Sequence, residues 1–553
     1  METVERLRAD CVVVGGGGAG LRAAVEARAA GLDTILVLKS VLGQSHTLMA
    51  EGGVNAAIGQ IDESDDWKAH YDDTIEAGRF INHKGMVEAL CRESPARMED
   101  LYDFGAGFEK DARGRLVQAD GHSGGQTRDR VISQGDFIGF IMQRALMAQA
   151  LKAEVRFIDE TIAVKLLRGD GGEAAGVLGY SLKKGCLLAL EAPRVVLACG
   201  GGGHVFGRTT NPVESTGEGY LLGFDAGLEL RDMEMTQFHP TGLCWPPSGR
   251  GILVTEACRA MGGKLYNARG ERFMERYDRR LELAPRDVVT RAIVQELEAG
   301  RGCSNGGVML DLTEIDAARL LYFLNNTARV IKSYQDIDIT REPFEVRPSA
   351  HHFMGGLVAR DVDTMEALPG VFLAGEIAWG THGANRLGGN SLAETQVFGR
   401  RAGAGAVQTR RPADLRDAAV TDALAEFRSV FESDDSNRTT IYQVRRGLGE
   451  IMDGQVGVIR SEESLRRADR DLEALRQVFA GCRKAIDNYH SVAHIFECDR
   501  MLTLARVIIA AALARRESRG AHFRSDFPEE SARRVNTSQK CDRGFQANEV
   551  EVP

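Results

Sequence analysis

The sequence lacks several features that would assign it to a common functional class. Its ten cysteines include no C-x-x-C pair, which argues against an iron–sulfur cluster or a zinc ribbon held by this chain alone. No apolar run reaches the roughly 20 residues that a membrane-spanning helix needs. The stretch 507–514 is short and lies between Arg506 and Arg515, so we expect a buried helix there. No basic block stands out among 69 basic and 79 acidic residues, which argues against a nucleic-acid protein.

The N-terminus shows no secretory signal, because a charged segment, residues 1–10, runs directly into an apolar stretch. Scattered cysteines are typical of a reducing compartment. We therefore expect a cytoplasmic protein. At 553 residues the chain is too long for one hydrophobic core, and roughly two to four domains are expected.

Glycine, in contrast, is abundant. The 63 glycines include several clusters, which indicate tight turns and a backbone that approaches a ligand closely. Gly15, Gly17 and Gly20 form a G-x-G-x-x-G motif between an expected strand, 11–14, and an expected helix, 21–30. In this context the first glycine allows the turn, the second admits a pyrophosphate, and the third lets helix and strand pack closely. The N-terminus of the helix would attract the phosphate charge.

A second expected strand, 34–38, completes the βαβ unit, but the acidic residue that usually binds the ribose of NAD at its end is missing. Lys39 and Ser40 stand there instead, which argues against a plain NAD dehydrogenase. Strand-like runs return at 194–198 and 370–374, each before a glycine. Such strands would feed loops that bind a ligand.

The segment 43–57, which begins Gly-Gln-Ser-His-Thr and contains Glu-Gly-Gly, strongly resembles the flavin-attachment segment of succinate dehydrogenase and fumarate reductase flavoproteins. In that family the histidine of the Ser-His-Thr run is bonded covalently to the 8α-methyl group of FAD. The resemblance implies the same bond at His46. An isolated histidine is more often a hydrogen-bonded structural residue, but the surrounding match disfavours that alternative. Aspartate oxidases, a sister family, lack this histidine.

Four further segments match the same family in the same order. They are 231–242, 253–259, 284–292 and 347–356, and the last leads on to 382–392. The resemblance covers the chain to about residue 528, and five colinear motifs are far more specific than any one of them.

The resemblance assigns substrate binding to His239, Thr255, His351 and Arg386. Succinate and fumarate are small dianions with a carboxylate at each end. Holding them requires donors or cations at both ends, and arginine is favoured where the contact is bidentate.

In this family, fumarate reduction delivers a hydride from N5 of the flavin to one alkene carbon and a proton to the other. The proton donor is the arginine of a Pro-Arg-Asp segment, here Arg286, while Glu256 and Arg259 match the path that resupplies its proton. Because the pKa of arginine lies above about 12, it can act as an acid only within such a relay. A surface or ion-pair role is the alternative for any single arginine.

The resemblance also implies cofactor contacts spread along the chain. They come from the glycine turn, the end of the second strand, the attachment segment and the region after the strand 370–374. The full set is Gly15, Gly17, Gly20, Lys39, Ser45, His46, Thr47, Glu51, Gly52, Gly53, Glu218, Glu376, Arg386, Ser391 and Leu392. Glu218 stands where the family has an aspartate. No metal ligands are predicted.

The fold implied is α/β. It has a Rossmann-like FAD-binding domain, 1–232 and 351–410, with an inserted α+β capping domain, 233–350. A C-terminal helical domain, 411–518, follows, and the polar segment 519–553 is expected to form a tail over the surface. The substrate would lie between the first two domains, where closure excludes water.

The resulting hypothesis is a flavoprotein catalytic subunit that interconverts succinate and fumarate. Since the chain has no cluster motif, an iron–sulfur partner subunit is implied. A further partner stays open: a membrane anchor, or a subunit that reacts with a quinone or a thiol. Through such partners the protein would lie at the inner face of the cytoplasmic membrane.

Glu51 favours fumarate reduction as the direction, because a carboxylate beside the flavin disfavours its anionic reduced form. Two other functions stay open. One is another oxidoreductase of the superfamily, of the aspartate oxidase or adenylylsulfate reductase type, which the joint presence of His46, His239, Arg286 and His351 disfavours. The other is a non-catalytic electron-transfer scaffold, which would require a degraded site.

Overall fold

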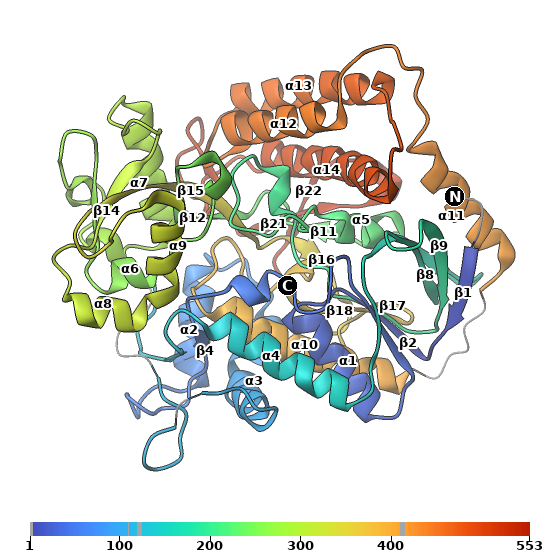
Figure 1. Ribbon diagram of the computed structural model, residues 1–553, viewed down its shortest axis with the longest axis horizontal. Helices are drawn as coiled ribbons and strands as arrows, with labels where there is room; N and C mark the ends of the chain where they lie inside the picture. Colours follow the sequence, from blue (N-terminus) through green and yellow to red (C-terminus); the bar gives the residue numbers. More distant parts are fainter. Residues whose placement is uncertain (1–3, 109, 119–123, 410–414) are drawn as a thin grey trace.

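The computed structural model describes residues 4–108, 110–118, 124–409 and 415–553 (Figure 1). Its central sheet has six strands in the order β17-β18-β10-β2-β3-β6. The inner strands are β10 (Val195–Leu197), β2 (Cys11–Val14) and β3 (Thr34–Val37), which run parallel. All their residues are buried, as expected for short apolar strands covered on both faces. The predicted βαβ unit is therefore confirmed.

The glycine motif fixes how the first helix packs on this sheet. α1 (Gly18–Ala29) begins three residues earlier than predicted, because the turn already ends at Gly17. Gly15 has φ +115°, and a Cβ there would lie 2.2 Å from the carbonyl oxygen of Ala198. A Cβ on Gly20 would lie 1.8 Å from the carbonyl oxygen of Gly15. Both positions therefore require glycine.

Three long helices cover this sheet region. They are α3 (Lys84–Asp103), α4 (Ile138–Lys152) and α10 (Asn390–Gln408), and α1 packs against α10 and α4. The shorter elements nearby are α2 (Trp67–Ala77), β4 (Val54–Asn55), β5 (Val131–Ile132), β6 (Arg156–Ile158), β16 (Gly356–Leu357), β17 (Glu366–Leu368), β18 (Val371–Leu373) and α5 (Glu218–Asp225).

A second sheet, in the order β1-β9-β8-β7, flanks the first. It contains β1 (Val4–Arg8), β7 (Thr161–Arg168), β8 (Ala174–Ser181) and β9 (Cys186–Glu191). The charged N-terminal segment, which the sequence did not assign to a strand, pairs in parallel with β9 as an edge strand. Its charged residues are tolerated because an edge strand keeps one side in solvent.

The region predicted to cap the site has its own sheet and core. The sheet, in the order β12-β15-β14-β13, contains β12 (Thr236–Leu243), β13 (Lys264–Tyr266), β14 (Val308–Asp311) and β15 (Phe344–Phe353). Its helices are α6 (Ala257–Ala260), α7 (Arg286–Glu298), α8 (Ala317–Phe323) and α9 (Asn325–Gln335). Figure 1 shows these elements gathered at one side of the molecule. The buried apolar residues of this region lie between Leu243 and Val346 in the sequence and form a cluster of their own. The exact limits of the capping domain, 233–350, stay a prediction.

The C-terminal third is helical up to Ala514. It contains α11 (Asp417–Ser429), α12 (Ile441–Ile451), α13 (Glu462–Gly481) and α14 (Tyr489–Ala514). The stretch 507–514 is the end of α14 and is largely buried, as predicted. None of the described helices is long and apolar enough to cross a membrane.

The expectation that the C-terminal segment is a surface tail is wrong for β21 (Val535–Gln539), in which every residue is buried. β21 lies between β11 (Leu230–Arg231) and β22 (Asn548–Glu551). Its polar side chains are bonded internally: the Asn536 amide donates to Asp232 at 2.6 Å, and the Thr537 hydroxyl donates to Glu234 at 2.8 Å. The polar composition of β21 therefore reflects a buried network of hydrogen bonds and ion pairs. Arg515 belongs to the same network, because it pairs with Asp232 and Glu234. The remaining short pair, β19 (Ile459–Arg460) and β20 (Phe523–Arg524), also joins the helical part to this segment.

Candidate active site

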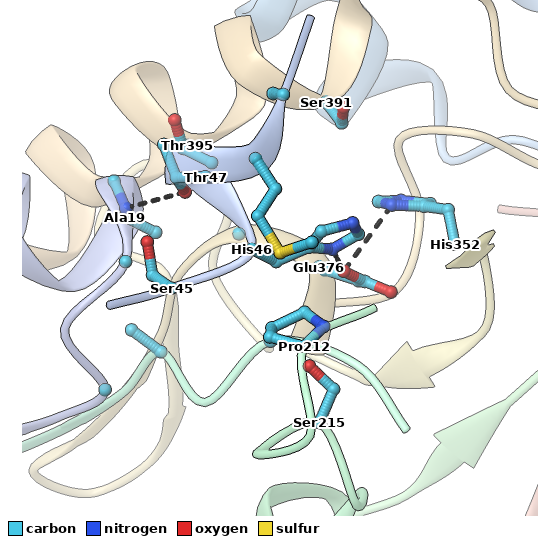
Figure 2. Close-up of a pocket in the computed structure, with 18 of the residues that line it drawn as sticks. Ala19, Ser45, His46, Thr47, Pro212, Ser215, His352, Glu376, Ser391 and Thr395 are labelled. Carbon is cyan, nitrogen blue, oxygen red and sulfur yellow. Dashed lines mark hydrogen bonds and ion pairs between the residues drawn. The ribbon is translucent and has the colours of Figure 1, made fainter. Parts of the chain in front are cut away.

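One cavity gathers residues from distant parts of the chain (Figure 2). It extends from the glycine turn after β2 to residues of β12, α7 and the segment 382–392. Every predicted site residue lines it except Gly20 and Arg259. Gly20 instead packs α1 on the strand end, and Arg259 stands behind Glu256, with 3.8 Å between its Nη2 and the carboxylate.

At one end, the cavity reaches the N-terminus of α1. Gly17 is the N-cap residue and offers no side chain to the free N–H groups of the first turn. Thr47 accepts a hydrogen bond from the Gly18 amide at 3.0 Å, which ties the attachment segment to this turn. An uncapped helix N-terminus behind a glycine turn is a ready site for a pyrophosphate.

The end of β3 carries a partly buried cation in place of the usual acid. Lys39 Nζ lies 2.7 Å from Glu218 and 2.9 Å from Glu497. Burial opposes the charged amine, but the two carboxylates outweigh it and raise the pKa of Lys39. Lys39 thus compensates the charge of Glu218, which replaces the family's aspartate.

The segment 43–57 places His46 against the cavity. His46 is the N-cap residue of the short helix η1 (Thr47–Met49), and its Nδ1 lies 4.0 Å from Glu376 (Figure 2). The Asn211 amide nitrogen is 3.5 Å from its Nε2. Burial and the charge of Arg386 lower the pKa of His46 to about 4. The imidazole is therefore neutral at physiological pH.

Glu376 lies at the centre of a cluster that the sequence predicted only in part. It accepts a hydrogen bond from the Phe353 amide at 2.9 Å and is 3.5 Å from His352 Nδ1. Burial raises the pKa of Glu376 to about 7. His352 was missed, although its position next to His351 in a matching segment was a usable signal.

Arg286 and Glu256 form a close ion pair at the start of α7. Arg286 donates through Nε to Glu256 at 2.7 Å and through Nη1 to the Gln237 side chain at 3.0 Å. Burial favours the neutral acid, but the charges of Arg286 and Arg259 prevail and lower the pKa of Glu256 below its usual range. The three residues therefore form a continuous charged chain that ends in the cavity. Gln237, which orients Arg286, was not predicted.

Two further histidines face the same space. The ring centroids of His239 and His351 are 5.2 Å apart, and the Thr210 hydroxyl lies 2.7 Å from His351 Nδ1. Burial and the charge of Arg286 lower the pKa of both rings well below its usual value. Both are thus neutral imidazoles, each with one N–H to donate.

Arg386 is the second arginine of the cavity and is only 4% exposed. Its Nη1 donates to the Ser391 hydroxyl at 2.9 Å, while its Nε has no hydrogen-bond partner among the described residues. Burial and the charge of Arg286 lower the pKa of Arg386 to about 9. A buried guanidinium with a free donor is costly unless an anion approaches it, so the site fits an anionic ligand.

Glu51 also lines the cavity, at the side of the capping region. It accepts a hydrogen bond from the Asn326 side chain at 2.9 Å. Burial and the nearby charge of Asp136 raise the pKa of Glu51 to about 8. The carboxyl is therefore mostly neutral at neutral pH. A negative charge on Glu51 can therefore favour fumarate reduction only at a pH above this pKa.

The residues present fit FAD. The uncapped helix and glycine turn suit its pyrophosphate. Around the rest of the cavity, several buried polar atoms lack a partner within the part of the chain that the structure describes; they are Glu51 Oε2, Asn211 Oδ1, His352 Nε2 and Arg386 Nε. Buried polar groups are normally satisfied, so these atoms indicate a polar ligand.

Comparisons with known families agree with this geometry. The family described as "FAD binding domain" matches residues 10–392. The family described as "Fumarate reductase flavoprotein C-term" matches residues 445–546.

Individual relatives are similar over nearly the whole chain. One of them, a fumarate reductase (CoM/CoB) subunit of Methanothermobacter marburgensis, is 40% identical, covering 95% of each chain. A succinate dehydrogenase flavoprotein subunit of Rickettsia bellii is 34% identical, covering 94% of this chain and 90% of its own. Among solved structures, E. coli quinol fumarate reductase FrdA superposes with a TM-score of 0.92 at 30% identity, covering 99% of this chain and 97% of its own.

Proposed function

Because this chain belongs to the family of succinate dehydrogenase and fumarate reductase flavoprotein subunits, which are FAD-dependent oxidoreductases, we propose that it interconverts succinate and fumarate. The observation that carries the proposal is the free donor capacity of Arg386 beside Arg286, His239 and His351 in one cavity. Two cations and two neutral donors suit a small dianion with a carboxylate at each end.

The chain's own residues divide the work into binding and proton transfer. Arg386, His239, His351 and Thr255 hold the dicarboxylate. Arg286 gives a proton to one alkene carbon of fumarate, or takes it from succinate, and Glu256 restores it. The ion pair suits this task because Glu256 accepts a hydrogen bond from Nε of Arg286, so the two side chains are in place to pass a proton between them.

FAD, when bound, supplies the hydride that adds to the other carbon and accepts it in the reverse reaction. The glycine turn with Gly15 and Gly17 would hold its pyrophosphate. Glu218, Glu376, Ser391 and Leu392 would contact the remainder, and His46 would bond to it. Closure of the capping region would keep water from the reacting carbons.

The direct test is a pair of assays on the purified protein. Succinate oxidation is followed with an artificial acceptor, and fumarate reduction with a reduced viologen. We expect both reactions. Turnover of neither substrate by protein that contains stoichiometric flavin would refute the proposal.

We further propose that electrons pass to or from an iron–sulfur partner subunit, since the relatives are themselves named as subunits. Such partners would hold the protein at the inner face of the cytoplasmic membrane or leave it in the cytoplasm. The name of the relative at 40% identity supports fumarate reduction as the main direction, and it supports a thiol, rather than a quinone, as the electron donor.

Covalent attachment of the flavin at His46 has a simple expected result. After acid precipitation, yellow fluorescence should stay with the polypeptide, and in His46→Ser it should move to the supernatant. His352→Ser is the matched control, because it removes a neighbouring imidazole that lines the same cavity. Full release of flavin from the unmutated protein would show that His46 is only a neighbour.

Glu51→Gln should change the direction of catalysis only at alkaline pH. Below the pKa of about 8, Glu51 is neutral, like the glutamine that replaces it; above it, Glu51 alone carries a charge. That charge lowers the reduction potential of the bound cofactor and so favours fumarate reduction. The ratio of fumarate reduction to succinate oxidation should therefore coincide in the two proteins at neutral pH and be higher in the unmutated protein above pH 8. Equal ratios at every pH would remove Glu51 from this role.

A further inference from the structure

Three buried side chains beside the cofactor cavity form a cluster that the proposed reaction does not use. They are His352 at the end of β15, His382 in the segment 382–392, and Glu394 in α10, and they are 4%, 3% and 1% exposed. One nitrogen or oxygen atom from each lies within 4.8 Å of the other two. We call these residues the His-His-Glu cluster. His352 and Glu394 line the cavity and His382 does not, so the cluster lies at its margin.

A hydrogen bond between His382 and Glu394 explains only part of this cluster. His382 Nε2 lies 3.1 Å from Glu394 Oε2, and the ring centroids of His352 and His382 are 5.1 Å apart. Two other buried atoms, His352 Nε2 and Glu394 Oε1, have no hydrogen-bond partner among the residues that the structure describes. Because buried polar atoms are normally satisfied, these two atoms indicate a ligand between the three side chains.

The surroundings of His352 prepare its free nitrogen to bind a cation. Its Nδ1 lies 3.5 Å from the carboxylate of Glu376 (Figure 2). When the proton of the neutral ring is on Nδ1, facing this carboxylate, Nε2 carries the lone pair. Histidines that bind metal ions almost always donate their other N–H to a carboxylate, a carbonyl or a water in this way.

The carboxylates of the cluster also lack a paired cation. The side chains of Glu394 and Glu376 are only 1% and 10% exposed. The ion pairs recorded for them, within the described part of the chain, are with histidines and not with lysine or arginine. A buried carboxylate is costly unless a cation pairs with it. A metal ion bound between the two histidines and Glu394 would offset this charge.

We propose that the His-His-Glu cluster binds a divalent metal ion with the ligand preferences of zinc. Imidazole nitrogen and carboxylate oxygen both suit zinc, which usually takes four ligands at structural sites. Two imidazoles, together with a carboxylate that binds through both of its oxygens, would supply four. His382 Nε2 and Glu394 Oε2 are already close enough to be two ligands of one ion, and a small rotation of the His352 ring would bring the third residue into place.

The ion would join three segments that lie far apart in the sequence. His352 follows His351 in β15, His382 stands in the same segment as Arg386, and Glu394 belongs to α10. The ion would therefore fix two parts of the proposed carboxylate clamp relative to each other, a role that rests on the proposed function. Binding of the ion itself does not depend on which substrate the cavity takes.

The test measures zinc in the purified, flavin-containing protein. The chain is produced in medium with and without added Zn²⁺, so that the ion can bind during folding, and gel filtration in a chelator then removes zinc from the surface. Zinc per chain, flavin content and Tm are determined for each preparation. Zinc is chosen as the probe so that iron from a partner subunit does not contribute.

Two variants remove one ligand each, and a third is the matched control. His352→Phe replaces an imidazole by a ring that cannot bind metal, and Glu394→Gln removes the charge but keeps the shape. The control is His494→Phe. His494 also neighbours a glutamate, with 3.6 Å between its Nδ1 and Glu497, but no third histidine, cysteine or acidic ligand joins this pair among the described residues.

We expect one zinc ion per chain in the unmutated protein and in His494→Phe, and a higher Tm in the zinc-grown preparations, because an ion that binds only the folded state stabilises it. His352→Phe and Glu394→Gln should contain no zinc after the chelator step. Loss of an outer hydrogen-bonding partner alone lowers metal affinity by roughly 10–100-fold, and loss of a ligand should lower it further. Added zinc should not change the Tm of these two variants.

Zinc content in His352→Phe equal to that of the unmutated protein would overturn the proposal, as would unmutated protein without zinc. Loss of zinc from His494→Phe would also overturn it, because the ion would then lie at the surface pair. If His352→Phe fails to fold, as judged by its flavin content, Glu394→Gln decides the outcome. The proposed function is judged separately by the succinate and fumarate assays, since the zinc measurement requires no turnover.

Discussion

Replacement of Arg286 by lysine is expected to leave dicarboxylate binding largely intact and to lower kcat by roughly 10²–10⁴-fold, the usual contribution of general acid–base catalysis. The guanidinium contacts Glu256 through Nε and Gln237 through Nη1. A lysine ammonium keeps the positive charge, but it is a single, shorter-reaching group that cannot make both contacts and also face the substrate.

The measurement is kcat and KM in both directions, with flavin content determined for each variant. A fall in kcat at nearly constant KM identifies an interaction used only in the transition state. Glu256→Gln should act in the same direction, because it interrupts proton resupply. Arg291→Lys is the matched control: it lies on the same helix, pairs with Asp287 and does not line the cavity. Near-normal turnover of Arg286→Lys would make Arg286 an electrostatic clamp and leave the proton donor to be sought elsewhere.

The residues that could be predicted from the sequence are those that touch a ligand directly. Four of them stand in short segments whose residue types and spacing indicate their role without a structure. They are His46, Glu256, Arg286 and Arg386, and all four line one cavity. The glycine motif was equally informative at Gly20, because a Cβ there would meet the carbonyl oxygen of Gly15 within the same βαβ unit, whereas the steric limit at Gly15 is set by the distant Ala198.

The residues that orient these groups could not be predicted in the same way. Gln237 contacts Arg286 across 49 positions, and it also donates to the backbone carbonyl of Arg386. Asn211 reaches His46 across 165 positions. Such contacts depend on how distant elements pack against one another. The sequence around a single asparagine or glutamine does not indicate which residue its side chain contacts. β21 was missed for a related reason, since its polar side chains bind a buried ionic network that only the fold assembles.

Arg386→Ala should weaken the binding of succinate and of malonate, a non-reacting dicarboxylate, by about 2–5 kcal/mol, the usual cost of removing one partner of a buried charge pair. That cost corresponds to a loss in affinity of about 30-fold to several thousandfold. The reason is the low exposure of Arg386 and its free Nε donor. Without the guanidinium, a ligand carboxylate would be left unpaired in a dry site. Malonate affinity is measured by competition and by calorimetry.

Arg386 also donates a hydrogen bond to Ser391 in the first turn of α10. The control must therefore distinguish the loss of a carboxylate contact from a change in the packing of α10. Ser391→Ala removes the same hydrogen bond but keeps the charge, so it should retain most of the malonate affinity. Flavin content is measured in both variants, since both residues are predicted cofactor contacts. If Ser391→Ala lost as much affinity as Arg386→Ala, the effect would arise from a displaced helix. If malonate bound equally well to Arg386→Ala with full flavin content, Arg386 would not belong to the clamp, and His239, His351 and Arg286 would have to hold both carboxylates.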